Sequence, residues 1–339
     1  MAVHPLPQRS FVHLADIVQR PALLSSWERL RHRQAHWFVE CVAEFTAAFL
    51  YTYAGVGSQA GFVLGNIAKL PLSSIFQIGV AYGIGCMLAL SVCAGTSGGH
   101  LSPAVTIAFT LFNGFPPLKA VRYIIAQILG AYVACLLVYV QYENLISEVT
   151  AGMISAGTYD STFFTPNGPA GIFGFYVMPG SKLGQVFLNE FVCDVIFGIV
   201  VFTLIDPTNF MVSPVMVPWV VGLTYATMIW SYAPVGVACN TARDLGGRLA
   251  ALTIWGRAAD GGAYAAISAL ANIPGILCGG LFYEIFFKDS SRVVTPDNID
   301  MITGHKAHEE HSQKRHGSAS SASSSYDDDK VSPQELGMA

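Results

Sequence analysis

Residues 97–106 read SGGHLSPAVT and residues 240–249 read NTARDLGGRL, and these two stretches decide the fold. Each lies at a turn that leads into a short apolar segment, at 103–112 and at 241–252. Ten helical residues reach about 15 Å, which is half of a bilayer's hydrocarbon core of about 30 Å. The two segments are therefore predicted to be re-entrant half-helices that enter a membrane without crossing it.

Around these stretches lie six apolar segments that are each long enough to span a bilayer. They run approximately over residues 37–58, 73–93, 118–141, 184–205, 214–233 and 262–287. Hydrophobic residues make up 53% of the chain and charged residues only 12%, most of them near the termini, which excludes an ordinary soluble domain. We expect an all-α membrane protein of six transmembrane helices and two half-helices.

The order of these elements repeats: two spans, a half-helix and a span, and then the same again. Glu44-Phe45 corresponds to Glu190-Phe191, and Ser102-Pro103-Ala104 corresponds to Asn240-Thr241-Ala242. Three spans per half is an odd number, so the second half enters the membrane with the opposite orientation, which predicts an inverted repeat around a central pore. The channel domain is expected at 37–287, with halves at about 37–141 and 184–287. Small residues at four-residue spacing predict close helix packing, in the pairs Gly79 and Gly83, Ala126 and Gly130, Gly222 and Ala226, and Gly275 and Gly279.

The two terminal segments flank this domain. Lys and Arg concentrate in residues 1–36, at Lys119 and Arg122 and after residue 287, so both termini are expected to be cytoplasmic, with a long outer loop at 142–182. No cleaved secretory signal is expected in the arm at 1–36. The tail at 288–339 is polar and Ser-rich and is expected to be disordered. Its serines 318–325 are either phosphorylation sites or part of a plain solvated tail.

The composition supports neither a nucleic-acid partner nor a metal or cofactor. The net charge of -4 is small and lies mainly in the tail, so no nucleic acid is expected. The seven cysteines show no paired metal-ligand spacing, and we expect small buried thiols, no metal and no cofactor.

Polar residues inside a membrane are costly unless they are paired or used, so those in the apolar region are the candidate functional residues. Ser102 and Asn240 stand at the N-cap positions of the half-helices, and Pro103 stands at the first helical position. If both N-termini meet at midplane, their dipoles repel cations while they donate hydrogen bonds to a solute. Arg243, near the mouth of such a pore, either binds solute hydroxyls or pairs structurally with Asp244 or Glu190. Glu44 and Glu190 are interpreted as braces for the two loops, with ion coupling as the alternative.

The two quoted stretches, with Glu44, Gln127 and Glu190, resemble the signature motifs of the aquaporin and aquaglyceroporin family over residues 37–287. The resemblance implies one pore per protomer, a homotetramer in the plasma membrane, and passage of glycerol, other small neutral solutes and water. By position it implies a selectivity filter of Tyr82, Met228, Val237 and Arg243, with Thr227 as the alternative to Met228 if the alignment shifts by one residue. It also implies midplane motifs of Ser102, Pro103 and Ala104 with Asn240, Thr241 and Ala242, and loop-bracing or pore-lining roles for Glu44, His100, Glu190 and Asp244. The absence of a filter histidine, together with Asp244 and Arg248, favours the aquaglyceroporin branch.

Two departures from the family pattern bear on this prediction. Ser102 replaces the usual asparagine, so one hydroxyl stands where an amide supplies two N–H donors. Thr241 replaces the usual proline, which removes a preset φ from the start of the second half-helix and could loosen the placement of Arg243. Cys239, beside Asn240, is a candidate pore thiol that mercurials would block.

Three alternatives stay open. Gly95-Thr96-Ser97-Gly98 resembles the nucleophile loop of rhomboid proteases, although His100 is the only histidine in the apolar region. A route for a protonated monocarboxylic acid such as lactic acid keeps the fold and changes the cargo. A gated or closed pore with a scaffold role is the third.

Overall fold

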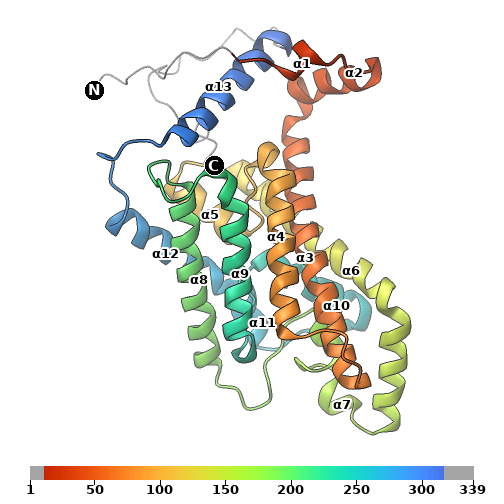
Figure 1. The fold of residues 1–339 in the computed structure, drawn as a ribbon. Helices are drawn as coiled ribbons and strands as arrows, with labels where there is room; N and C mark the ends of the chain where they lie inside the picture. Colours follow the sequence, from red (N-terminus) through yellow and green to blue (C-terminus); the bar gives the residue numbers. More distant parts are fainter. Residues whose placement is uncertain (1–10, 317–339) are drawn as a thin grey trace.

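The computed structural model describes residues 11–316, and every regular element among them is helical, as predicted (Figure 1). The bundle is built from nine of these helices: α3 (His36–Ala68), α4 (Ile75–Ser97), α5 (Pro103–Phe112), α6 (Pro117–Ser155), α8 (Leu183–Ile205), α9 (Val217–Tyr232), α10 (Thr241–Trp255), α11 (Tyr264–Leu270) and α12 (Asn272–Phe286).

Five stretches of the described chain are long and apolar enough to cross a membrane: Ile75–Ser97, Pro117–Ser155, Leu183–Ile205, Pro214–Val235 and Tyr264–Phe286. We assign α3 as the sixth span because it is 33 residues long and packs along α4 and α6. It carries the polar residues Glu40, Glu44 and Gln59, which interrupt its apolar run. The predicted half-helices are α5 and α10, which are 10 and 15 residues long.

The two halves exchange their half-helices, as an inverted repeat requires. The α5 helix packs against α12 of the second half, and α10 packs against α6 of the first. The halves also meet where α4 crosses α9, and there Gly83 and Gly222 pack together: a Cβ added to Gly83 would lie 2.7 Å from the carbonyl oxygen of Gly222. The bundle core therefore joins both halves of the chain.

Small residues let the helices approach closely within each half as well. A Cβ added to Gly130 would lie 2.2 Å from the carbonyl oxygen of Phe45, and one added to Gly279 would lie 2.2 Å from that of Val195. Backbone approaches of this kind drive helix packing in lipid. The predicted small-residue packing is confirmed on α4, α6, α9 and α12.

Two spans are longer than predicted. The first continues past residue 58 to Ala68, where Lys69 takes a left-handed conformation with φ of 58°. The third continues past residue 141 to Ser155, and Ile146, Val149 and Met153 are buried on one face of the added turns. Both extensions were wrongly predicted as loops because polar residues interrupt their apolar runs, while helical periodicity continues.

The remaining outer segment folds back onto the bundle. After α6 come α7 (Tyr159–Thr162) and the 3₁₀ turn η2 (Pro169–Ile172). Phe163, Ile172 and Phe173 are at most 1% exposed and pack against the ends of α3, α6 and α10. The predicted outer loop is therefore a packed layer over one end of the bundle.

The last two spans contain irregular turns. The fifth begins with the 3₁₀ turn η3 (Pro214–Met216), and the sixth is divided into α11 and α12. Pro274 lacks a backbone N–H and cannot bond to the carbonyl of residue 270, which accounts for the division. The predicted start at residue 262 is two residues early, because α11 begins at Tyr264.

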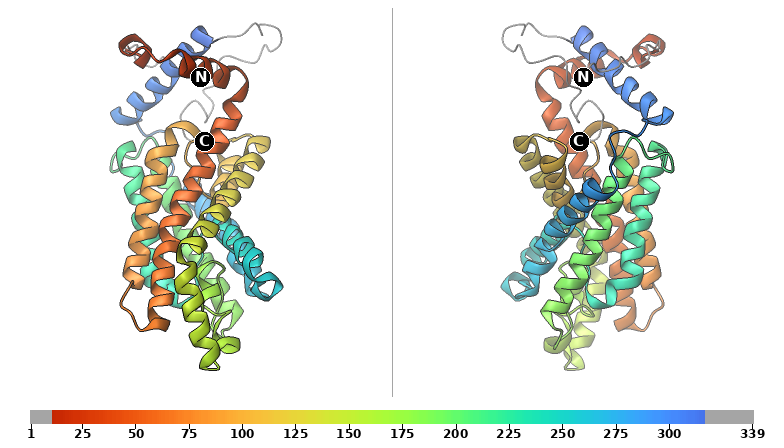
Figure 2. Two further views of the ribbon diagram at one scale, coloured as in Figure 1. Left: turned by 90° about the vertical axis from the view of Figure 1, so that its right-hand side faces the viewer. Right: turned by 90° about the vertical axis from the view of Figure 1, so that its left-hand side faces the viewer.

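Both terminal segments lie at the other end of the bundle, away from α7 (Figures 1 and 2). The arm forms α1 (Leu14–Ile17), α2 (Ala22–Leu30) and the π-helical turn η1 (Arg31–Ala35), which continues into α3. The tail forms α13 (Pro296–His316), so the prediction of disorder is wrong for this stretch. Thr295 caps α13 by accepting from the N–H of Asn298, and Ile302 is buried at 3% exposure. Residues 317–339, with the predicted phosphorylation sites, lie outside the described part.

Candidate functional site

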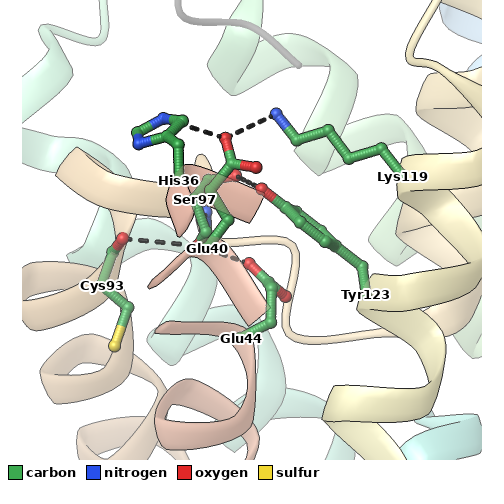
Figure 3. Close-up of polar contacts among 8 residues, drawn as sticks. His36, Glu40, Glu44, Cys93, Ser97, Lys119 and Tyr123 are labelled. Carbon is green, nitrogen blue, oxygen red and sulfur yellow. Dashed lines mark hydrogen bonds and ion pairs between the residues drawn. The ribbon is translucent and has the colours of Figure 1, made fainter. Parts of the chain in front are cut away.

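Glu44 of α3 holds the first of the two loops. Its Oε1 accepts from Ser97 Oγ at 2.6 Å (Figure 3) and from the backbone N–H of His100 at 3.0 Å. Its Oε2 accepts from the N–H of Leu101 at 3.0 Å and from Gln127 Nε2 at 2.7 Å. The carboxyl group is fully buried, and all four partners are supplied by other elements. The contacts support the predicted bracing role.

Glu190 of α8 holds the second loop in the corresponding way. Its Oε1 accepts from the N–H groups of Ala238 at 3.0 Å and Cys239 at 2.7 Å, and its Oε2 also accepts from Ala238 at 2.8 Å. Within the described chain it has no side-chain partner like Gln127, so this brace is simpler than the first. Each glutamate satisfies backbone donors that would otherwise be buried without a partner.

The two loops meet tip to tip. Leu101 and Cys239, one residue before each half-helix cap, have φ angles of 56° and 52°. This left-handed geometry turns the chain sharply into each half-helix. Asn240 Nδ2 then donates to the carbonyl oxygen of Leu101 at 3.2 Å, which joins the two tips. The positive ends of α5 and α10 are thus brought together, as predicted, and oppose cations there.

The two caps differ. Asn240 Oδ1 accepts from the N–H groups of Ala242 at 2.9 Å and Arg243 at 3.3 Å, so it caps α10. Ser102 stands at the corresponding position of α5, but its hydroxyl makes no cap bond and has no partner, although the residue is only 1% exposed. Pro103 and Ala104 begin α5 directly behind it. The buried Ser102 hydroxyl is therefore available to a solute or water molecule.

Thr241 makes a contact that proline would lack. Its Oγ1 donates to Asn272 Oδ1 at 2.6 Å, and Asn272 is fully buried at the start of α12. The bond fixes the first turn of α10 to the neighbouring span. The expected loosening is thus offset by a hydrogen bond.

Arg243 is held by four acceptors from three segments. Its Nε donates to Tyr82 Oη at 2.9 Å and its Nη1 to the carbonyl of Phe173 at 2.6 Å. Its Nη2 donates to Gln59 Oε1 and to the carbonyl of Ile172, both at 3.1 Å. A guanidinium has five N–H groups, so one remains. No ion pair of residues 11–316 includes Arg243, so the predicted alternative of a partner in Asp244 or Glu190 is not observed.

The four predicted filter residues all line one cavity of about 540 Å³. Tyr82 and Arg243 form its polar side, while Met228 and Val237 contribute apolar surface. A site with polar and apolar walls suits a polyol, whose hydroxyls and CH groups can face opposite sides.

Gln59 and Phe175 complete this cavity and were not predicted. Gln59 lies one residue past the predicted end of the first span, and Phe175 lies in the outer segment with its ring 3.9 Å from Arg243 Cζ. If the prediction had followed the helical periodicity through residue 68, it would have placed Gln59 on the first span. Sequence offers no comparable signal for Phe175, because its position depends on how the outer segment folds back.

The other predicted polar residues lie behind the loops. His100 is 3% exposed, bonds Thr106 Oγ1 through Nδ1 at 3.1 Å and packs among aromatic rings. Asp244 Oδ2 accepts from Ser268 Oγ at 2.9 Å. Arg248 donates to the carbonyls of Ala259 and Phe175. These contacts favour bracing over pore lining for Asp244 and Arg248.

The protease-like arrangement does not form. Ser97 Oγ donates to Glu44 and to the carbonyl of Cys93 (Figure 3), while the His100 ring bonds Thr106. A serine nucleophile requires a histidine within hydrogen-bond reach, and these two side chains are directed to other partners.

Cys239 lines the 540 Å³ cavity, as the mercurial prediction requires. The expectation that all seven thiols are buried is wrong for Cys278, which is exposed on the outer surface of α12, and Cys41 is only half-buried. All seven are free.

Two further cavities continue along the bundle. One of about 80 Å³ lies below the tips and includes Ser102, His100 and Tyr225 in its wall. The next, of about 750 Å³, opens between the bundle and the terminal segments. The rings of Tyr51, Tyr82 and Tyr225 pack at 5.1–5.2 Å between the first two cavities. The cavities thus follow one another from the outer segment to α13.

Comparison with known proteins agrees with this geometry. The profile of the family described as "Major intrinsic protein" matches residues 31–260. The protein named "Aquaporin-3" of Laccaria bicolor is 51% identical over 306 residues, which cover 89% of this chain and 93% of that protein. A "Glycerol uptake facilitator protein" of Pseudomonas aeruginosa is 34% identical over 255 residues, or 73% and 88% of the two chains. The X-ray structure of the aquaglyceroporin from Plasmodium falciparum has a TM-score of 0.61 at 24% identity, covering 78% of this chain and 99% of that one, and shows the fold alone.

Proposed function

The chain belongs to the major intrinsic protein family, and we propose that it is an integral membrane channel for passive passage of glycerol, other small uncharged solutes and water. The observation that carries the proposal is the cavity lined by the hydrogen-bonded pair Arg243 and Tyr82 together with the apolar side chains of Met228 and Val237. Such a cavity offers hydrogen bonds to the hydroxyl groups of a polyol and an apolar surface to its CH groups. The relative named for glycerol uptake supports this choice of solute.

We assign selectivity to Tyr82, Met228, Val237 and Arg243, with Gln59 and Phe175 added from the cavity. Gln59 and the carbonyls of residues 172 and 173 fix the guanidinium, and the Phe175 ring covers it. The fixed cation and the paired half-helix N-termini oppose protons and other cations. No catalytic step and no cofactor enter this proposal.

The membrane arrangement is part of the same proposal. Arg31 and Lys119 line the cavity at the end with both terminal segments, while Lys182 lines the cavity at the opposite end. The excess of positive charge favours the cytoplasm for the terminal segments. We propose the plasma membrane as the location and a homotetramer as the assembly.

Osmotic experiments on proteoliposomes test the function. An impermeant solute drives shrinkage, and a glycerol step then reports re-swelling, both against empty liposomes. We expect fast shrinkage and fast re-swelling. Fast shrinkage alone would mean a water channel. If neither shrinkage nor re-swelling is faster than in empty liposomes, the proposal is contradicted, and a protonated-acid route or a closed scaffold is favoured.

Two substitutions of similar size locate the filter. Val237→Phe adds a ring beside Arg243 and is expected to lower glycerol permeability more than water permeability. Leu281→Phe adds similar bulk on α12, where Leu281 is 48% exposed on the outer surface, and is expected to change neither. Equal effects of the two variants would contradict the assignment of Val237.

A further inference from the structure

The helix α2 of the N-terminal arm exposes an apolar face. At about 3.6 residues per turn, its large apolar side chains fall within about one third of the helix surface, and they are 43–81% exposed: Leu23, Leu24, Trp27 and Leu30. Ser25 and Arg29 lie on the opposite side. In α1, Leu14 and Ile17 are exposed as well. A contiguous apolar surface of this kind marks an interaction site.

The C-terminal helix α13 does not cover this face. Both views in Figure 2 show α13 crossing the arm beyond the end of the bundle. The ring of His13 stacks on that of His311 at 3.8 Å, and His32 Nδ1 lies 3.1 Å from Ser312 Oγ. The arm thus meets α13 through histidine side chains, while the apolar side chains of α2 stay exposed.

The exposed apolar surface continues along the chain onto the first span. Trp37 and Phe38 at the start of α3 are exposed on the outside of the bundle, and Val42 follows one turn later. The guanidinium of Arg122 lies 5.2 Å from the centre of the Trp37 ring. Aromatic and basic side chains of this kind are typical of the boundary between lipid and water. The membrane boundary is therefore expected near Trp37.

The apolar face of α2 lies close to the headgroup layer. Leu30 precedes Trp37 by seven residues, which span about 10 Å in a helix, and the headgroup layer adds about 5–8 Å to each side of the hydrocarbon core. Figure 1 shows α2 turned sideways from the axis of α3. Between them, Ala35 departs from helical geometry, with φ of −120° and ψ of 18°. A small rotation at this residue brings α2 onto the membrane surface.

The charge of the arm complements an anionic surface. Residues 11–35 contain four arginines and two acidic residues, which gives a net charge of +2 with histidine neutral. Arg20 and Arg29 are exposed at the two ends of α2. Arg20 pairs with Glu28 at 2.8 Å, and a surface pair of this kind is weak. Short amphipathic helices with basic residues bind in the plane of anionic bilayers, which attract the charge while the acyl chains cover the apolar face.

A second copy of the chain is a less suitable partner for this face. Two arms that met through α2 would bring together segments of the same positive charge, and like charges repel. The helix is also only nine residues long, so a contact between two copies of it would bury little apolar area. An anionic bilayer attracts the arm and offers acyl chains to its apolar face.

We propose that α1 and α2 form an anchor that binds the anionic phospholipid surface of the membrane that the channel spans. Leu23, Trp27 and Leu30 insert between the lipids, while Arg20 and Arg29 contact their negatively charged headgroups. The anchor also positions α13, which contacts the arm. The inference rests on the proposed membrane location and not on the identity of the solute, because lipid binding is measured without a solute gradient.

The test uses the full chain in lipid nanodiscs, in which both membrane faces are accessible. Leu23→Cys and Ser25→Cys each carry a nitrobenzoxadiazole label on opposite faces of α2, in a background where the accessible Cys41 and Cys278 are replaced by alanine. With phosphatidylserine present, the label at position 23 is expected to be quenched by nitroxide-bearing lipid and shielded from aqueous acrylamide, and the label at position 25 is not. Phosphatidylcholine alone, or high salt, is expected to lower the ratio of shielded to accessible label at position 23 by at least about fivefold.

Two double variants separate the contributions of charge and apolar contact. Arg20→Gln with Arg29→Gln is expected to lower this ratio by about tenfold or more in phosphatidylserine nanodiscs. Trp27→Ser with Leu30→Ser is expected to abolish the shielding in every lipid. The matched control is Arg257→Gln, which removes an exposed charge at the opposite end of the bundle and is expected to change nothing. Circular dichroism verifies the helical content of each variant.

Three outcomes overturn the proposal. The first is equal acrylamide quenching of the labels at positions 23 and 25 in phosphatidylserine nanodiscs. The second is the same shielding at position 23 with phosphatidylcholine alone. The third is energy transfer between copies labelled at position 23 without quenching by nitroxide-bearing lipid, which would show that a second copy of the chain covers the apolar face.

Discussion

Replacing Glu44 with glutamine is expected to destabilise the protein by about 1–3 kcal/mol, the cost of one buried N–H group without an acceptor. Glutamine puts an NH₂ group in place of one carboxylate oxygen. At the Oε1 position the NH₂ meets the His100 N–H, and at the Oε2 position it meets the Leu101 N–H. The Ser97 hydroxyl and the Gln127 amide can turn to accept instead, but a backbone N–H cannot. One backbone donor is therefore lost in either orientation.

The corresponding change at Glu190 is expected to cost less. With its NH₂ at the Oε2 position, the remaining Oε1 keeps the N–H groups of both Ala238 and Cys239, at 3.0 and 2.7 Å. The buried Asp194 carboxyl group, whose two oxygens have no hydrogen-bond partner among the described residues, lies within 4.8 Å of the Glu190 carboxyl group. Glu190→Gln should therefore change stability by less than about 1 kcal/mol, since no backbone donor is left without an acceptor.

The assay is chemical or thermal unfolding of the purified variants in one detergent, followed by circular dichroism. Glu284→Gln serves as the control because it removes a half-buried carboxylate at the bundle surface whose ion pair, among the described residues, is with Lys288 across one helical turn. Such a surface pair contributes at most about 1 kcal/mol. If Glu190→Gln lowered the free energy of unfolding as much as Glu44→Gln, or more, the reasoning from the hydrogen-bond pattern would be refuted.

Three further predictions follow from the site and the terminal segments. Ser102→Asn should keep a glycerol-conducting pore in proteoliposomes, because the unbonded hydroxyl is replaced by a group with more donors; loss of all transport would contradict this. Mercuric chloride should lower the permeability of the native protein but not of Cys239→Ser, and persistent block in the variant would place the reactive thiol elsewhere. Burial and the nearby His305 lower the pKa of His308 below its ordinary value of about 6.5. The neutral form of His308 is therefore favoured when α13 is docked on the arm. Docking should be strongest above about pH 6.5 and should weaken as the pH falls below it. Fluorescence energy transfer between labelled α2 and α13 in metal-free buffer measures this docking. The fluorophores are attached at positions other than Lys and Arg residues. Unchanged energy transfer between pH 7.5 and 5 would contradict this prediction.

Much of the membrane architecture was predictable because it depends on local composition. The half-helix α5 begins and ends at the predicted residues, since a proline starts it and a glycine-containing turn ends it. The fourth span was also predicted to within one residue. The pairing of Glu44 with the first loop and Glu190 with the second followed from their equivalent positions in two halves of one repeat. In each case a single segment, or a comparison of two segments, carries the information.

The sequence alone was less informative where packing decides the outcome. Polar residues interrupt the apolar runs of α3 and α6, yet both helices continue because Leu64 and Val149 find buried contacts beyond the predicted ends. The composition of α13 is that of a disordered tail, but the helix docks on the arm and buries Ile302.

By itself, the sequence determined that this protein crosses a membrane in an inverted repeat, where two half-helices present their N-termini and Arg243 to a pore. Those features follow from hydropathy, helix length and the symmetry of two motifs. Only the tertiary structure decided which groups complete the site. Gln59 and Phe175 reach Arg243 because α3 continues and the outer segment folds inward, and the terminal histidines meet because α13 crosses the arm. The physical reason is that these contacts join segments far apart in the chain, and no local pattern records the distance between them.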